Sequence, residues 1–192
     1  MRLLGTIVRL QYQRDHLKIL DGPYKRYDPG NIVPVEELRI TPDGIEAGPI
    51  DAPVIDVHNR THPRSLNRGD NGLSIGFSGH YALMRERFGD RITDGIAGEN
   101  IIIAYSGRIF ADELAAGLSI ATADGPVIVD RVIVATPCVE FSRYALDFPC
   151  DAKPDLSVTE TVRFLHQGVR GYYARTGQSA TLRLGDQVSI LA

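Results

Sequence analysis

Short apolar segments, separated by turn residues, recur along the sequence and constrain its fold more than any other feature. Leu118–Ala123 and Val127–Val134 flank Asp124-Gly125, a dipeptide that favours the tight turn of a β-hairpin. Most of the other segments are too short for helices and contain many β-branched residues, so we expect strands there too. These predicted strands are Leu4–Tyr12, Val35–Thr41, Ile45–Ala47, Val54–Val57, Ile101–Ile103, Tyr172–Arg175, Ala180–Arg183 and Gln187–Leu191.

Two segments have the start and stop signals of helices. Ser78–Phe88 begins with a residue that can cap a helix and precedes Gly89. Ser157–Gln167 opens with a capping box and precedes Gly168, while residues 141–146 allow one more helical turn. The strands do not alternate with helices, so the fold is predicted to be mainly β, a closed or nearly closed antiparallel β-barrel with a few peripheral helices.

Length, charge and cysteine content limit the classes of function. A chain of 192 residues is expected to form one domain, spanning residues 1–192. The formal net charge of −3 indicates no nucleic acid or membrane partner. Two cysteines do not make a disulfide framework, and the apolar start of the chain is too short for a signal peptide or a membrane span. We therefore expect a cytoplasmic protein with reduced thiols.

Cys138 is the main candidate for chemistry. Val132–Val134 is predicted to be a buried strand that stops before Pro137, because proline donates no hydrogen bond to a strand partner. Cys138 then lies just past a strand end, where side chains tend to face a cleft. It is either a reactive or ligating thiol at the mouth of the barrel, or a small packed hydrophobic residue.

A polar segment after Val57 contains arginines at every fourth position, Arg60, Arg64 and Arg68. These side chains form either an anion site or a solvated surface. His58 and His62 have the spacing of a helical metal pair, but the segment has a loop composition and no third ligand at a usual interval, so zinc is not expected. Residues 13–33, also polar, are expected to form a long loop.

Four motifs in a fixed order resemble the MOSC family, named for the C-terminal domain of molybdenum-cofactor sulfurases. The likeness extends from about Val35 to the end of the chain, although many members have an arginine at the position of Ala135 and a His-Gly-Gly element that this chain lacks. The motifs are Gly98–Ile101 before a strand, Thr136–Cys138 after one, Gly168–Tyr173 and Gly185–Ile190.

The resemblance implies a barrel like that of the pyruvate kinase barrel domain and a functional Cys138. One hypothesis is a sulfur carrier or sulfurtransferase in which Cys138 holds sulfur as a persulfide, with a cysteine desulfurase or a molybdoenzyme as partner. Another is a molybdopterin-binding reductase of N-hydroxylated compounds in which Cys138 ligates molybdenum. A third is a non-catalytic barrel that binds a small ligand or a partner.

An anionic cofactor such as molybdopterin would need arginines and backbone N–H groups. Arg170, which lies between two glycines, is the first choice, and Arg143 or Arg170 could stabilise a Cys138 thiolate that Glu140 would oppose. Pyridoxal phosphate is not expected in this chain, because Lys18, Lys25 and Lys153 lie in loop-like segments and an internal aldimine needs a positioned lysine. The candidate cofactor-binding residues are Arg170, Arg64, Arg60, Arg68, Glu99, Asn100, Gly98 and Gly171.

Overall fold

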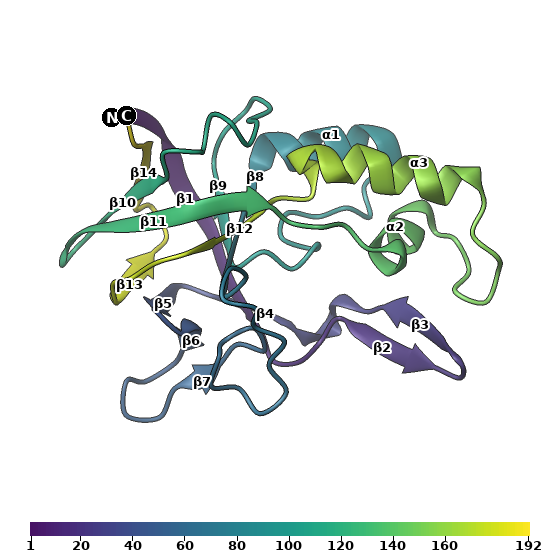
Figure 1. Cartoon of the computed structure of the whole chain (residues 1–192), viewed down its shortest axis with the longest axis horizontal. Helices are drawn as coiled ribbons and strands as arrows, with labels where there is room; N and C mark the ends of the chain where they lie inside the picture. The colour runs from purple at the N-terminus through teal and green to yellow at the C-terminus, as the bar shows by residue number, and fades with distance from the viewer.

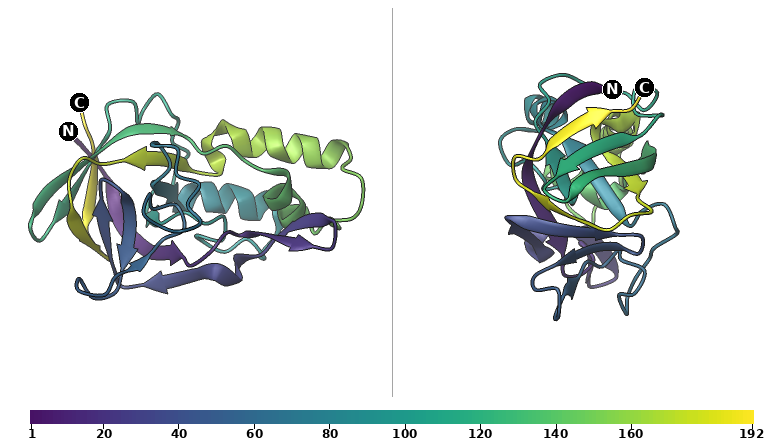
Figure 2. Two further views of the ribbon diagram at one scale, coloured as in Figure 1. Left: turned by 60° about the horizontal axis from the view of Figure 1, so that its bottom comes forward. Right: turned by 90° about the vertical axis from the view of Figure 1, so that its left-hand side faces the viewer.

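Seven strands close into a barrel because the long strand β1 (Arg2–Gln13) pairs with strands on both of its sides. Its first half pairs with β14 (Gln187–Ile190), and its second half pairs with β9 (Ile101–Ile103) and β4 (Ile32–Val35). The computed structural model describes residues 1–192, and both chain ends lie at the same end of the barrel (Figures 1 and 2). The remaining barrel strands are β10 (Leu118–Thr122), β11 (Gly125–Val134), β12 (Tyr172–Arg175) and β8 (Leu73–Phe77), in that order from β14 towards β9.

The predicted closed barrel is confirmed, and all neighbours in it are antiparallel except β8 and β9. Those two strands are parallel because the chain between them returns through helix α1 (Ser78–Phe88), which carries it back to the same end of the sheet. All three isoleucines of β9 are fully buried, as expected for a strand covered on both faces.

Smaller sheets extend the barrel. One contains β13 (Ala180–Arg183), β5 (Glu37–Thr41), β6 (Gly44–Ala47) and β7 (Val54–Ile55). The prediction of a long loop over residues 13–33 is wrong at its centre. There the chain forms a hairpin of β2 (Lys18–Asp21) and β3 (Tyr24–Tyr27).

Three α-helices pack beside the barrel, at the right of Figure 1. The predicted bounds of α1 are confirmed, although Ser78 does not cap it; the Ser78 hydroxyl instead bonds the backbone of Tyr105. α2 (Val139–Leu146) is longer than the single turn expected. α3 (Leu156–Phe164) begins after Asp155, whose carboxylate accepts the first free N–H groups, and it continues as a π-turn, Leu165–Val169.

Two hydrophobic cores result from this arrangement. One fills the barrel, and the other lies among the helices, the hairpin and the outer face of β9. Tyr27 joins the hairpin to the second core, because its ring packs edge-on against Phe141 and beside Tyr144 of α2. Cys138 lies at the edge of this second core.

No helix in the structure is both long and apolar enough to cross a membrane.

Candidate functional site

Cys138 lies where the barrel meets helix α2. Strand β11 ends at Val134, and Cys138 is the N-cap residue of α2, with its sulfur 3.4 Å from the Phe141 backbone nitrogen. Its side chain is partly buried and lines a cavity of about 770 Å³. The thiol therefore faces a space large enough for a cofactor-sized ligand.

The cavity is lined by basic side chains and by no acidic one. Arg68 and Arg170 contribute guanidinium groups, while the hairpin adds Lys18 from β2 and Lys25 from β3. His16 and His58 also line the cavity, and their ring centroids are 6.4 Å apart. An anionic ligand is the chemical class that this lining favours. The remaining lining residues include Gln13, Tyr27, Ser65, Asn67, Asn71, Ser74, Gly98, Thr136 and Tyr173.

Arg170 lines the cavity and lies next to the buried carboxylate of Glu99. Its side chain is 12% exposed, and its Nη1 atom lies 3.6 Å from Glu99 Oε1, too far for a hydrogen bond. Both atoms are buried and have no hydrogen-bond partner. Burial raises the pKa of Glu99, although the Arg170 charge and the hydroxyl of Tyr81, which donates to Oε2, counteract this effect. Glu99 is thus a counter-charge for Arg170 and does not line the cavity.

Three other predicted residues stand near the cavity in supporting positions. The Asn100 side chain accepts from the backbone and hydroxyl of Ser74 and donates to the backbone of Gln11, so it ties the turn to two strands. Gly98 lines the cavity, but its carbonyl is already bonded by Gln13. Gly171 has φ of +110°, and a Cβ there would lie 2.7 Å from the Ile75 carbonyl oxygen. Glycine at position 171 is required by packing against β8, not by approach of a ligand.

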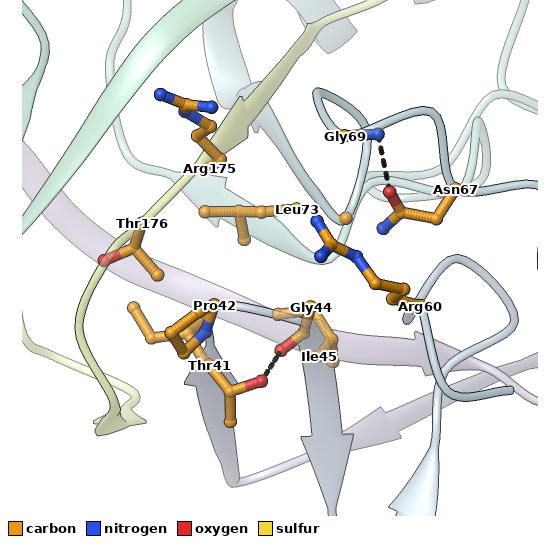
Figure 3. Close-up of a pocket in the computed structure, with 12 residues that line it drawn as sticks. Thr41, Pro42, Gly44, Ile45, Arg60, Asn67, Gly69, Leu73, Arg175 and Thr176 are labelled. Atoms are coloured by element: carbon orange, nitrogen blue, oxygen red, sulfur yellow. Dashed lines mark hydrogen bonds between the residues drawn. The ribbon is translucent and has the colours of Figure 1, made fainter.

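The regular arginine series does not form one site. Only Arg68 lines the cavity with Cys138. Arg64 is 63% exposed and pairs with Asp15. Arg60 lies in a separate pocket of about 10 Å³ (Figure 3), where its Nε atom is 3.8 Å from an Asp43 carboxylate oxygen. The loop between Val57 and Leu73 is irregular, so a four-residue spacing does not align side chains there as it would on a helix.

The sequence alone did not identify Lys18 and Lys25 as site residues. Both were assigned to a loop, and that assignment is wrong, since they lie on the paired strands β2 and β3 beside the cavity. The available signal was a turn, Gly22-Pro23, between two four-residue segments. The loop placement of these two lysines therefore no longer argues against pyridoxal phosphate. The expectation that this chain does not bind pyridoxal phosphate stays an untested prediction.

Two charged neighbours of Cys138 differ in their roles. Arg143 donates to the carbonyl oxygens of Cys150 and Ala152, so it fastens the following loop and is not directed at the thiol. Glu140 lies 3.7 Å from Lys18. Burial opposes ionisation of Glu140, but its own backbone N–H, Lys18 and the neighbouring Cys138 lower the pKa of this carboxyl. The negative charge near Cys138 is thus already paired with a cation.

No known family model matches the sequence, and no curated protein matches it. Solved structures do match. The YuaD protein of Bacillus subtilis has a TM-score of 0.54 at 12% identity over 98% of this chain and 94% of its own. YiiM of Escherichia coli has a TM-score of 0.55 at 13% identity over 100% and 70%. YiiM of Geobacillus stearothermophilus has a TM-score of 0.51 at 14% identity over 100% and 75%. At such identities the likeness shows the fold alone, which this chain shares with these three proteins.

Proposed function

We propose that the chain is a MOSC-type protein whose cavity binds an anionic cofactor of the molybdopterin class, with Cys138 as the ligand of molybdenum. The observation on which this proposal rests is a thiol in the wall of a cavity of about 770 Å³ that is lined by four cationic side chains and no acidic one. A protein that only carries sulfur needs a thiol and a docking surface, so the volume and the charge favour a bound cofactor.

The residues present fit such a group. Thiolate is a soft ligand suited to molybdenum, and Cys138 is the cysteine in the cavity wall. A pterin phosphate requires fixed donors, which Arg68, Arg170, Lys18 and Lys25 would provide. The Nη1 atom of Arg170 is buried and faces Glu99, so this ion pair holds the guanidinium group in place at the cavity wall. When bound, the metal would supply two-electron chemistry, while these side chains bind and orient the ligand.

A sulfur carrier is the second candidate, and the position of Cys138 at the start of α2 favours it. The backbone N–H of Phe141 points at the sulfur, and the helix N-terminus stabilises a negative charge there. In a transfer step, the Cys138 thiolate attacks the outer sulfur of a donor persulfide. A new S–S bond forms on Cys138, the donor S–S bond breaks, and the donor leaves as a thiolate. A cysteine desulfurase would be a suitable donor.

The two candidates are separated by analysis of the protein purified from a molybdenum-replete host. Molybdenum and pterin would be measured per protein chain in the parent, in Cys138→Ser and in Cys150→Ser as the matched thiol control. We expect molybdenum and pterin in the parent and in Cys150→Ser. Cys138→Ser should lose the metal and keep most of the pterin, because the phosphate donors remain.

The parent could contain neither metal nor pterin and still form a persulfide on Cys138 after incubation with a persulfide donor. That result would refute cofactor binding and support the sulfur-carrier function. A parent with neither group and no persulfide would refute both functions.

A further inference from the structure

A buried carboxylate next to the cavity has four hydrogen bonds. Asp56 is completely buried, and its Oδ2 atom accepts from the Gln13 backbone nitrogen at 2.6 Å and from the Asn100 side chain at 3.1 Å. Its Oδ1 atom accepts from the His58 backbone nitrogen at 2.8 Å and lies 3.2 Å from His58 Nδ1. Donors from strand β1, from the turn before β9 and from the loop after β7 thus fix the orientation of this carboxylate.

The imidazole of His58 connects this carboxylate to the cavity. Its side chain is 24% exposed and lines the cavity that Cys138 also lines. A ring nitrogen that faces a carboxylate keeps its proton, so Nδ1 is the protonated nitrogen in the neutral form and Nε2 is left for exchange. A histidine that served only to pair with Asp56 would not need to reach the cavity. The ring of His58 contacts Asp56 through Nδ1 and also lines the cavity.

We propose that His58 is the proton-transfer residue of the Cys138 cavity and that Asp56 positions it. This inference rests on the proposed function and adds the residue that supplies protons to the substrate. The reaction considered is the reduction of an N-hydroxylated compound, the substrate class that the resemblance to the MOSC family implies for a molybdopterin-binding reductase. Asn100 and Gln13 act through Asp56, since both donate to the carboxylate that holds the ring.

The proton requirement follows from the stoichiometry of that reaction. Reduction of an N-hydroxyl group to the N–H compound takes two electrons and two protons and releases one water. An external reductant, such as a reduced viologen, supplies the electrons. His58 gives the Nε2 proton to the hydroxyl oxygen as the N–O bond breaks, and water supplies the second proton to nitrogen. The neutral ring then regains a proton from solvent through its exposed edge.

Several charged groups surround the ring of His58. Asp56 contacts the ring, and the cations Lys18, Lys25, Arg68 and Arg170 line the same cavity. The His16 ring also lies near the His58 ring, and its Nε2 atom lies 2.9 Å from the Arg64 carbonyl oxygen. Arg64 itself pairs with Asp15.

The test compares the cofactor-loaded parent with His58→Gln and with His62→Gln. His62 lies four residues further along the same loop, outside the cavity, and is the matched control. Turnover of an N-hydroxylated substrate would be measured with reduced viologen from pH 5 to pH 9. We expect kcat of His58→Gln to fall roughly 10²- to 10⁴-fold, with KM and metal content little changed, and its pH–rate profile to lose the limb that falls with rising pH. His62→Gln should behave as the parent.

A second measurement does not depend on turnover. Nitrogen-15 NMR of the imidazole rings identifies which nitrogen of neutral His58 holds the proton, and we expect Nδ1. An Nε2–H ring, or unchanged kcat and an unchanged pH profile in His58→Gln, would overturn the inference. An inactive parent would refute the reductase function, and the NMR result would then decide by itself whether Asp56 positions the ring.

Discussion

Arg170 and Arg64 have the same side chain and opposite surroundings. Arg170 is nearly enclosed, with Glu99 behind it and the cavity in front, whereas Arg64 is largely exposed and paired with Asp15. Enclosure reduces the competition from water, so a hydrogen bond from Arg170 to an anion is stronger than one from Arg64. Arg170 and Arg64, both candidate cofactor-binding residues from the sequence, therefore differ in how strongly they can bind an anion.

Arg170→Gln is expected to weaken binding of a phosphate-bearing pterin roughly 10- to 150-fold, because a charge-assisted hydrogen bond contributes about 1.5–3 kcal/mol. Arg64→Gln, the matched control, should change the Kd by less than about twofold. Titration calorimetry measures both. Since Arg170→Gln leaves Glu99 buried without a counter-charge, the double variant with Glu99→Gln should also be measured. Equal affinities in all variants would contradict the role of Arg170.

The sequence identified the residues of this site unevenly, for physical reasons. The position of Cys138 past a strand end was predictable, because proline and β-branched residues determine strand limits locally. The partner of Arg170 and the positions of Lys18 and Lys25 were not, since they depend on contacts between distant segments. Glu99 and Asn100 were noticed at a strand start, but only the fold shows that both bond protein groups.

At the scale of elements, side-chain contacts fix each element against its neighbours. Helix α1 is fixed to the barrel by His80, which is buried against the rings of Phe77 and Tyr172. The backbone nitrogen of Ile109 donates to His80 Nε2 at 3.1 Å, so the ring must be neutral. The hairpin is fixed to α2 by Tyr27. Such contacts follow from tertiary packing and not from helix or strand signals, which is why α1 was predictable and the docking of the hairpin was not.

The pH dependence of stability follows from His80. Burial lowers the pKa of its imidazole from 6.5 to about 4, and the nearby Arg108 charge acts in the same direction. Between these two pH values the unfolded chain binds a proton that the folded chain excludes, so stability falls as the pH drops from about 6.5 towards 4. The loss should approach about 3 kcal/mol.

Urea unfolding at pH 7.5, 6, 5 and 4 measures this effect in the parent, in His80→Gln and in His166→Gln. Glutamine at position 80 offers an acceptor for the Ile109 N–H and does not titrate, so its stability should fall less steeply on acidification. His166 is exposed, and its variant should follow the parent. The same slope in His80→Gln as in the parent would contradict this account of α1.

At the scale of the whole molecule, barrel closure and cavity formation have different origins. The barrel was predictable from short apolar segments and turn dipeptides, because alternation and turn chemistry act locally. The cavity forms where the hairpin, the 56–71 loop, the turn before β9 and the Thr136–Cys138 segment meet at one end of the barrel. That meeting requires the β8–α1–β9 crossover and the docked hairpin, neither of which any single motif encodes.

The central claim is that Cys138 is an accessible thiol in a cationic, anion-binding cavity. It is tested most directly by alkylation of the native parent with iodoacetate and with neutral iodoacetamide, followed by peptide analysis at Cys138 and at Cys150. We expect the ratio of the iodoacetate rate to the iodoacetamide rate to be several-fold higher at Cys138 than at Cys150. This preference should fall with added salt, and inorganic phosphate should protect Cys138. An unreactive Cys138, or equal ratios at both thiols with no protection by phosphate, would contradict the account.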